Sequence, residues 1–392
     1  MKRTAVFSAA LLAVLPLLTC GCAPAPSTVQ PVTPASPCPL SNSAPLAVAV
    51  GARANVPKPK LPPEVQDLMR AAAKNHQRLT LIRVDGQPRI VFDQAPPPTA
   101  GNPEAEKQAV TSYLAAAQSA FGKQITAVSP QADVLTALSV GARTTQPGGT
   151  VVLVDSGLQT VAPLDFAKDG LLQANPAEVA KYLTEGRLLP DLHGRTVLLV
   201  GLGNTAPPQP VLDNNLRAKV VDTWKAVAEA SGACVVTIAQ GNTDKSVGDK
   251  PEVAVVAPPP APAPQLCGTV ELGERDNISF NADTDTFRDP QAARETLRKF
   301  AEVLRDGRHR AELIGTTATD GPMAGRVELS MRRAEAVKAV LVEFQVAADH
   351  LTARGVGTDW PGHLADVGPD GRLLPGPAGQ NRKVIMNITC SA

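Results

Sequence analysis

Short apolar runs alternate with helical patterns along residues 46–256. Continuous apolar stretches at 150–155 and 196–200 predict strands that are buried on both faces. Between such runs, apolar residues recur at the spacing of a helix with one buried face. This alternation predicts an α/β domain with a parallel, doubly wound sheet. Strands are expected at 46–50, 79–84, 89–92, 150–155, 196–200 and 234–239, and helices at 63–72, 103–121, 131–143, 177–186 and 214–230.

Residues 267–392 carry a different pattern. Helical patterns at 290–305 and 329–344 are flanked by short strand-like stretches at 269–272, 278–280, 311–315 and 384–388. This βαβαβ order predicts an α+β domain with one layer of helices against a mixed sheet.

Two proline-rich tracts separate these regions. Residues 23–45 and 257–266 hold prolines too closely spaced for regular helix or sheet, so we expect an extended tether and a linker. The expected organisation is therefore a signal peptide at 1–22, a tether at 23–45, an α/β domain at 46–256, a linker at 257–266 and an α+β domain at 267–392.

The N-terminus has the pattern of an export signal. Basic residues at positions 2 and 3 precede an apolar stretch that ends in a Thr-Cys-Gly-Cys sequence. This sequence resembles a bacterial lipobox, which implies a lipid on Cys22 or, alternatively, on Cys20. Ordinary cleavage to a secreted protein is the other interpretation. No later apolar run is long enough to span a bilayer.

Cysteine parity favours Cys22. Loss of Cys20 with the signal leaves four cysteines, an even number in an oxidising compartment. Because each pair would join the two ends of one expected domain, we favour Cys38–Cys234 and Cys267–Cys390. Free buried thiols are the alternative.

Composition limits the classes of partner. The formal net charge is +1, from 38 basic and 37 acidic residues, and aromatic residues make up only 3% of the chain. This balance disfavours nucleic-acid binding, which needs a basic surface and often stacking aromatic residues.

Several spaced motifs occur in residues 268–390. Phe280 precedes the first helix, and residues 315–318, 329–334, 355–357 and 381–384 are Gly-Thr-Thr-Ala, Leu-Ser-Met-Arg-Arg-Ala, Gly-Val-Gly and Asn-Arg-Lys-Val. They resemble the OmpA-like domain of bacterial envelope proteins, which has Gly-His-Thr-Asp, Leu-Ser-x-x-Arg-Ala, a Gly-x-Gly turn and Asn-Arg-Arg-Val. The resemblance implies a bacterial source. An excess of Arg over Lys, with abundant Ala and Pro, fits a GC-rich genome such as that of an actinobacterium.

The resemblance implies binding to peptidoglycan through the diaminopimelate of a stem peptide. That residue presents an amine and a carboxylate, so its site needs an acid and an arginine, whose planar fork suits a carboxylate. Arg333 matches the family arginine, but Ala318 stands at the position of the family aspartate. The predicted site comprises Asp320 as a substitute acid, Arg333, Thr317, Leu329 and Arg382.

Each charged residue of this site has a structural alternative. Asp320 precedes a Gly-Pro pair and could merely cap a turn. Arg333 could form a surface ion pair with Glu335 or Asp320, and Arg382 could be a solvated charge at a strand end.

The α/β region resembles the von Willebrand factor type A fold in its order of elements, which includes a hairpin through Asp85 and Gly86. That family usually carries a metal site that begins Asp-x-Ser-x-Ser after the first strand. Residues 51–55 are Gly-Ala-Arg-Ala-Asn here, and Asp155 alone cannot supply the oxygens a hard cation requires. We therefore expect neither a metal nor a cofactor.

Catalytic patterns are weak. A Gly-Leu-Gly-Asn-Thr-Ala sequence at 201–206 follows a strand, but prolines at 207, 208 and 210 oppose the helix that a dinucleotide site requires. Asp155, Ser156, Asp191 and His193 place an acid, a hydroxyl and an imidazole in one region, but such a co-occurrence is expected by chance in about 200 residues, and no Gly-x-Ser-x-Gly motif is present.

We therefore expect a lipid-anchored envelope protein, not an enzyme, that faces and binds the cell wall while its α/β domain contacts an unknown protein partner. The alternatives are a C-terminal module that has lost wall binding and serves as a scaffold or interaction domain, and an uncharacterised enzyme in the α/β domain.

Overall fold

The computed structural model describes residues 38–40, 44–99, 101–240, 245–260, 263 and 267–390. The expected signal peptide with Cys20 and Cys22, most of the tether and part of the linker lie outside these residues. Residues Cys38–Ala392 belong to one compact unit. Within the described part, no helix combines the length and apolar character needed to cross a bilayer.

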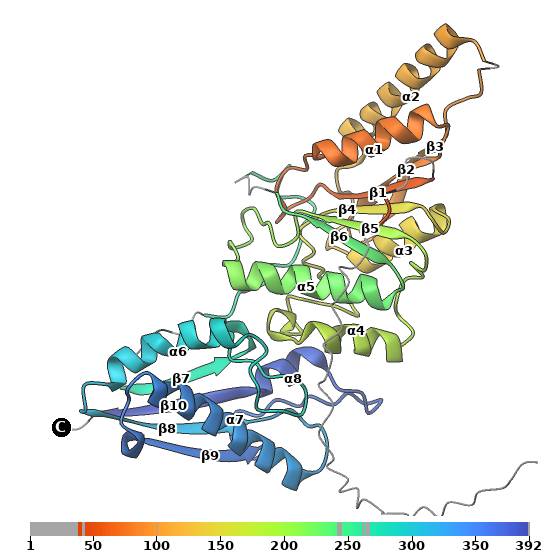
Figure 1. The fold of residues 1–392 in the computed structure, drawn as a ribbon. Coiled ribbons are helices and arrows are strands. Elements are labelled where there is room, and N and C mark those ends of the chain that lie inside the picture. The colour runs from red at the N-terminus through yellow and green to blue at the C-terminus, as the bar shows by residue number, and fades with distance from the viewer. Residues whose placement is uncertain are drawn as a thin grey trace, which may run out of the picture. The chain divides into compact units, whose positions relative to one another are not determined.

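The first sheet has six strands in the order β3-β2-β1-β4-β5-β6 (Figure 1). All neighbours are parallel except β2 and β3, which form the expected hairpin. The bounds are β1 Leu46–Gly51, β2 Leu79–Val84, β3 Arg89–Gln94, β4 Thr150–Val154, β5 Thr196–Val200 and β6 Cys234–Ile238. The prediction of a parallel sheet in this region is therefore confirmed.

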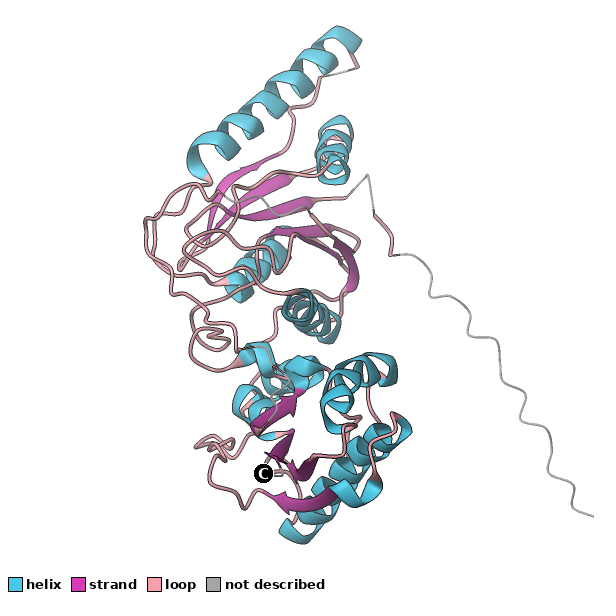
Figure 2. Ribbon diagram, turned by 90° about the vertical axis from the view of Figure 1, so that its left-hand side faces the viewer, coloured by secondary structure: helices cyan, strands magenta, loops and turns pink. Residues whose placement is uncertain are grey.

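Helices cover both faces of this sheet (Figure 2). Alternate residues of β1 point to opposite sides, so Val48 packs in the core of α1 and α2, whereas Ala49 packs in the core of α3, α4 and α5. This double burial explains the continuous apolar strands. The helices are α1 Pro63–Lys74, α2 Pro103–Gln124, α3 Val134–Thr144, α4 Pro176–Glu185 and α5 Asn214–Ala230.

Residues 253–256, just before the expected linker, lie against the α/β region. Asn55 donates its side-chain amide to the carbonyls of Val253 and Ala254 at 3.1 and 3.0 Å. Gln209 exchanges two hydrogen bonds with the backbone of Val256. These contacts hold the segment before the linker against the α/β region.

The second sheet has four strands in the order β7-β10-β8-β9. Only β8 and β9 are parallel, which makes the sheet mixed as predicted. Apolar residues of α6 and α7, among them Phe300 and Leu341, pack on Leu313 and Met386 of the sheet. The bounds are β7 Gly268–Gly273, α6 Pro290–Leu304, β8 His309–Thr316, α7 Met323–Glu343, β9 Leu351–Gly357, α8 Pro375–Asn381 and β10 Lys383–Cys390.

Two local expectations for the C-terminal region were wrong, and one helix there was not predicted. Residues 278–280 form no strand, and only a single bridge joins Phe280 to Phe287. Residues 355–357 end strand β9 instead of forming a turn. The glycines there let α7 cross the sheet closely, because a Cβ on Gly355 would lie 2.3 Å from the amide nitrogen of Met331. Helix α8 has a Pro- and Gly-rich sequence without helical periodicity, so no pattern predicted it.

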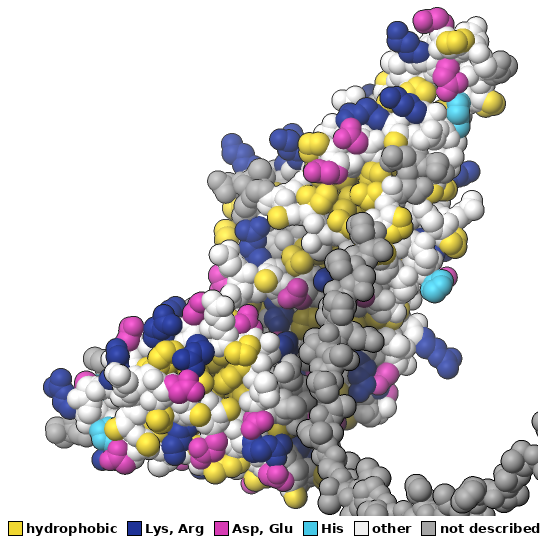
Figure 3. All heavy atoms as spheres, in the orientation of Figure 1, with side chains coloured by type: hydrophobic (Ala, Val, Ile, Leu, Met, Phe, Trp, Pro, Cys, Tyr) yellow, Lys and Arg dark blue, Asp and Glu magenta, His cyan; other side chains and the backbone are white. Residues whose placement is uncertain are grey.

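Two disulfide bonds link Cys38 to Cys234 and Cys267 to Cys390, the pairing that the sequence favoured. Charged side chains of both signs are mixed over the face shown in Figure 3, in keeping with the formal net charge of +1.

A candidate ligand cavity around Arg333

A cavity of about 490 Å³ lies where the loop after β7, the loop after β8 and the first turns of α7 meet. Its wall includes all five residues that the sequence predicted for the site. These residues come from separate elements: Thr317 and Asp320 follow β8, Leu329 and Arg333 lie on α7, and Arg382 precedes β10.

Arg333 is almost fully buried, with 6% of its surface exposed. Its Nε donates to the carbonyl of Thr284 at 2.9 Å, and its Nη2 to that of Asn281 at 3.4 Å. The guanidinium carbon lies 5.1 Å from the centre of the Phe280 ring. The loop between β7 and α6 therefore fixes the orientation of the arginine, and Phe280 has a structural reason to precede α6.

Burial, with a smaller contribution from the nearby charges of Arg382 and Arg332, lowers the pKa of Arg333 to about 10, while Asp283 and Asp285 oppose the shift. The side chain stays protonated at neutral pH. Among the residues that the structure describes, no carboxylate forms an ion pair with Arg333, so the proposed pair with Glu335 or Asp320 does not form. An anion entering the cavity would meet a positioned, weakly hydrated cation.

The acid position of the family motif is apolar here. Ala318 is buried and lines the cavity. Next to it, Thr317 is only 3% exposed, and its hydroxyl has no hydrogen-bond partner within the described ranges. A buried hydroxyl without a partner is costly, so a ligand that bonded to it would remove that cost.

Asp320 shares the cavity with Arg333 but is exposed to solvent. Its amide bonds to the carbonyl of Ala318 at 2.9 Å, so the residue also belongs to a tight turn. Leu329 is half-buried and supplies an apolar part of the wall.

Arg382 is not the solvated charge that the sequence allowed. Its Nη1 lies 2.6 Å from Oε2 of Glu178, and the two side chains are 22% and 23% exposed. Glu178 lies on α4, outside the second sheet altogether, and also lines the cavity. The sequence analysis missed Glu178, because no local pattern relates residues 204 positions apart.

The cavity is cationic. Glu274 is already engaged, because both of its oxygens accept from Arg288 and Lys219 also contacts it. Basic side chains outnumber acidic ones around the cavity: Lys181, Arg288, Arg326, Arg332, Arg333 and Arg382 against Glu178, Glu274, Asp283 and Asp320. This excess favours a ligand that carries negative charge.

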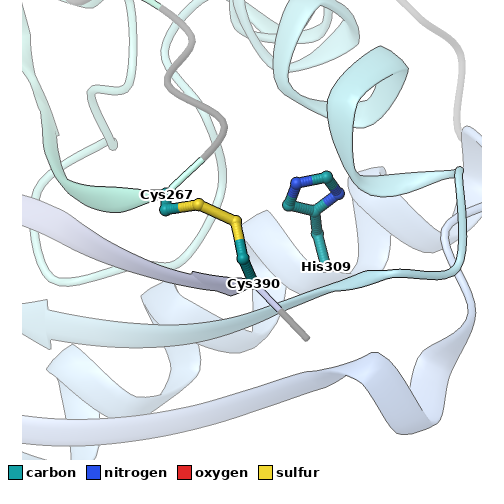
Figure 4. A group of neighbouring side chains, drawn as sticks. All are labelled: Cys267, His309 and Cys390. Carbon is teal, nitrogen blue, oxygen red and sulfur yellow. A yellow bond between two sulfur atoms is a disulfide. The ribbon is translucent and has the colours of Figure 1, made fainter. Parts of the chain in front are cut away.

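Two other clusters of polar side chains in the described part are not arranged to bind a metal. Cys267, His309 and Cys390 lie close together (Figure 4), but both sulfurs are in a disulfide bond and offer no thiolate to a metal, and His309 Nδ1 pairs with Asp306 at 2.7 Å. In the first sheet, Asp155 is buried and paired with Arg53, whose Nη2 lies 2.9 Å from Oδ1. The Asp155 carboxylate, which the sequence analysis considered as a metal ligand, is therefore bound to the Arg53 guanidinium.

The residues considered for catalysis are not joined. Ser156 contacts Asp155 at 3.4 Å, while Asp191 accepts from the backbone amide of His193. No hydrogen bond in the described part connects the His193 ring to Ser156. After β5 the chain follows a loop until α5 begins at Asn214, so no helix opens directly behind the glycines at 201 and 203.

The OmpA-like resemblance was tested against known proteins. A family model described as "OmpA family" matches residues 279–366. No curated protein matches. Similar solved structures include the OmpA-like domain of FopA1 from Francisella tularensis subsp. tularensis SCHU S4, at 13% identity over 31% of this chain and 71% of that one, with a TM-score of 0.24.

Two further solved structures are similar to the same part of the chain. The peptidoglycan-associated lipoprotein from Burkholderia pseudomallei is 20% identical over 30% of this chain and 89% of its own, with a TM-score of 0.25. A periplasmic domain of MotB from Helicobacter pylori is 20% identical over 34% and 90%, with a TM-score of 0.26. Because the family match covers the loop and helix that build the Arg333 cavity, the C-terminal part of this chain is an OmpA-like domain.

Proposed function

We propose that this protein is an exported envelope protein that associates non-covalently with peptidoglycan through its OmpA-like domain. The observation that carries the proposal is Arg333, a buried and oriented cation that lines an open cavity without an acidic partner in the described structure. Peptidoglycan stem peptides present carboxylates that suit a guanidinium fork.

The ligand group we infer is the free end of diaminopimelate. Its carboxylate would bind Arg333, and the unpartnered hydroxyl of Thr317 would accept or donate a further hydrogen bond. Its ammonium needs an acid, and Asp320, in the loop after β8, is the candidate from the OmpA-like domain that the sequence predicts. No metal or cofactor enters this proposal.

A lipid on Cys22, or alternatively on Cys20, would anchor the chain to the envelope membrane, and the proline-rich tether would let the folded part face the wall. We further propose that the α/β region has a von Willebrand A-like arrangement without the metal site and binds a protein partner instead of acting as an enzyme. The strand order and the Arg53–Asp155 pair support this view.

One alternative has an observation of its own. Ala318 replaces the usual acid and Arg382 is already paired, which would also fit an OmpA-like domain that has lost wall binding and serves as an interaction module.

A sedimentation assay with purified sacculi tests the proposal. Arg333→Ala should weaken retention by at least roughly 30-fold, because truncating one side of a buried charge interaction commonly costs about 2–5 kcal/mol. Arg308→Ala is a matched control, since that side chain is 79% exposed. If the folded wild-type protein is not retained, or if Arg333→Ala is retained equally, wall binding through this cavity is wrong.

A further inference from the structure

The Arg333 cavity has a wall that the OmpA-like domain does not supply. The first turns of α4 contribute Asn175, Glu178 and Lys181 to its lining. Glu178 and Lys181 are three residues apart and so lie on one face of the helix.

Specific contacts seat α4 at this position. Besides the Glu178–Arg382 pair, the Arg372 guanidinium lies 4.5 Å from the centre of the Tyr182 ring and donates to the Tyr182 carbonyl at 3.0 Å. Since Glu178 and Tyr182 are four residues apart, one face of α4 makes both contacts.

Backbone packing beside α4 is equally close. A Cβ on Gly376 would lie 1.6 Å from the carbonyl oxygen of Asp169, and one on Gly379 would lie 2.1 Å from that of Gln173. Helix α8 therefore rests directly on the segment that leads into α4, and both of its glycines are required for that approach.

The four carboxylates that line the cavity differ in availability. Glu274 has both oxygens occupied. Asp283 and Asp320 are exposed, where water and salt screen their charge. Glu178 is mostly buried and uses only Oε2 for Arg382, which leaves Oε1 to accept another hydrogen bond. A less hydrated carboxylate interacts more strongly with an ammonium group.

Resting on the proposed function, we propose that Glu178 supplies the acidic half of the wall-binding site that is absent at Ala318. The site is then composite: α7 of the OmpA-like domain provides the guanidinium, and α4 provides the carboxylate. Its ligand class is an amino-acid centre with a free ammonium and a free carboxylate. Glu178 lies in the first turn of α4.

The test compares two soluble probes by calorimetry: a stem tripeptide that ends in diaminopimelate, and the same peptide acetylated on the free side-chain amine. Wild-type protein should prefer the free amine. Glu178→Gln keeps the shape of the side chain but removes its charge. It should weaken binding of the free-amine peptide roughly 10- to 100-fold and leave the affinity for the acetylated peptide unchanged.

Three control variants separate the alternatives. Glu185→Gln removes another α4 carboxylate that is 45% exposed and outside the cavity wall, and it should change neither affinity. Asp320→Asn should have less than a twofold effect. Tyr182→Ala loosens the α4 contact without removing an acid, so any loss should affect both peptides equally.

Several results would overturn the inference alone. The first is unchanged binding of the free-amine peptide by Glu178→Gln. The second is tighter binding of that peptide by Glu178→Gln, which would mean that Glu178 blocks the cavity. The third is loss of the preference for the free amine in Asp320→Asn instead of in Glu178→Gln. In each of these cases Arg333-dependent retention on sacculi would still stand. If wild-type protein binds neither sacculi nor peptide, the proposed function and this inference both fail.

Discussion

Two buried aspartates show how much a carboxylate in this fold depends on its partner. Asp155 is paired with Arg53 through two side-chain contacts, and removing either partner of such a pair typically costs about 3–5 kcal/mol. Asp276 is also buried, but its Oδ1 accepts no hydrogen bond, and the Arg275 guanidinium is 3.6 Å away. Burial raises the pKa of Asp276 to about 6.

Asp276→Asn should therefore stabilise the protein at neutral pH but not in acid. The folded protein binds the Asp276 proton more tightly than the unfolded chain, so wild-type stability falls as pH rises from about 3.8 to about 6. The asparagine side chain does not titrate, so the variant does not lose stability in this way. Its advantage in the free energy of unfolding should grow by up to about 3 kcal/mol across that interval, as denaturant titrations at several pH values would show.

Asp306→Asn is a control whose effect on stability should depend on pH in the opposite direction. A hydrogen bond from His309 and another from the Arg308 amide hold the pKa of Asp306 below its usual value, so its contribution is lost as pH falls. A stabilising effect of Asp276→Asn that is the same at pH 3.5 and 7.5 would contradict the burial argument.

At the residue level, the sequence predicted Arg333 and Asp320 for the cavity wall but missed Glu178, another charged residue of that wall. The Leu-Ser-x-x-Arg-Ala motif places Arg333 by local spacing on one helix, and the structure puts it in a cavity wall. Glu178 reaches the same cavity only through tertiary packing. No periodicity or motif encodes that contact.

At the level of elements, two glycines decide how closely α7 approaches its sheet. Gly315 and Gly355 are neighbours in the parallel β8–β9 register, and α7 crosses over both. A Cβ on Gly315 would lie 1.9 Å from the Ser330 carbonyl oxygen. The side chain of Ser330 then donates to Val327 and accepts from the Gly357 amide, which ties the helix to the end of β9.

Gly315→Ala should force α7 away from β8 and lower the free energy of unfolding by about 1–3 kcal/mol, the usual cost of overpacking. It should also weaken sacculus retention, because α7 carries Arg333. Gly122→Ala in α2 is the matched control: a Cβ there meets nothing within 4 Å, and alanine favours helix by about 0.5–1 kcal/mol. Equal stability of the two variants would refute the close-packing argument.

Local periodicity decides which elements the sequence could predict. Strands such as β2 and β5 and helices such as α5 have strong periodicity, and their bounds agree closely with the expectation. Strand β9 contains the sequence Ala-Arg-Gly-Val-Gly, whose glycines favour a turn when read locally. Only its position under α7 makes those glycines compatible with a strand.

At the level of the whole molecule, one disulfide bond joins the expected tether to β6, and the other closes a long loop within the OmpA-like domain. Cys38–Cys234 spans 196 residues and Cys267–Cys390 spans 123. Between the regions the contacts include close backbone packing of α8 and ion pairs such as Lys219 with Glu274, whose side chains are 12% and 9% exposed. Ionic contacts of this kind stabilise less than an apolar core of similar size.

Replacement of Cys267 and Cys390 by serine should therefore destabilise the OmpA-like domain without destabilising the α/β region. Loop entropy predicts a loss of about 4–5 kcal/mol for a loop of this length. The two tryptophans report on the two parts separately, because Trp224 is fully buried in the core of the α/β region and Trp360 is half-buried beside Lys383 in the OmpA-like domain. With Trp224→Phe and Trp360→Phe backgrounds, fluorescence-monitored unfolding should show only the Trp360 transition at lower denaturant. If both transitions shift together, the ionic contacts couple the two regions into one cooperative unit, and the prediction of separately folding domains is wrong.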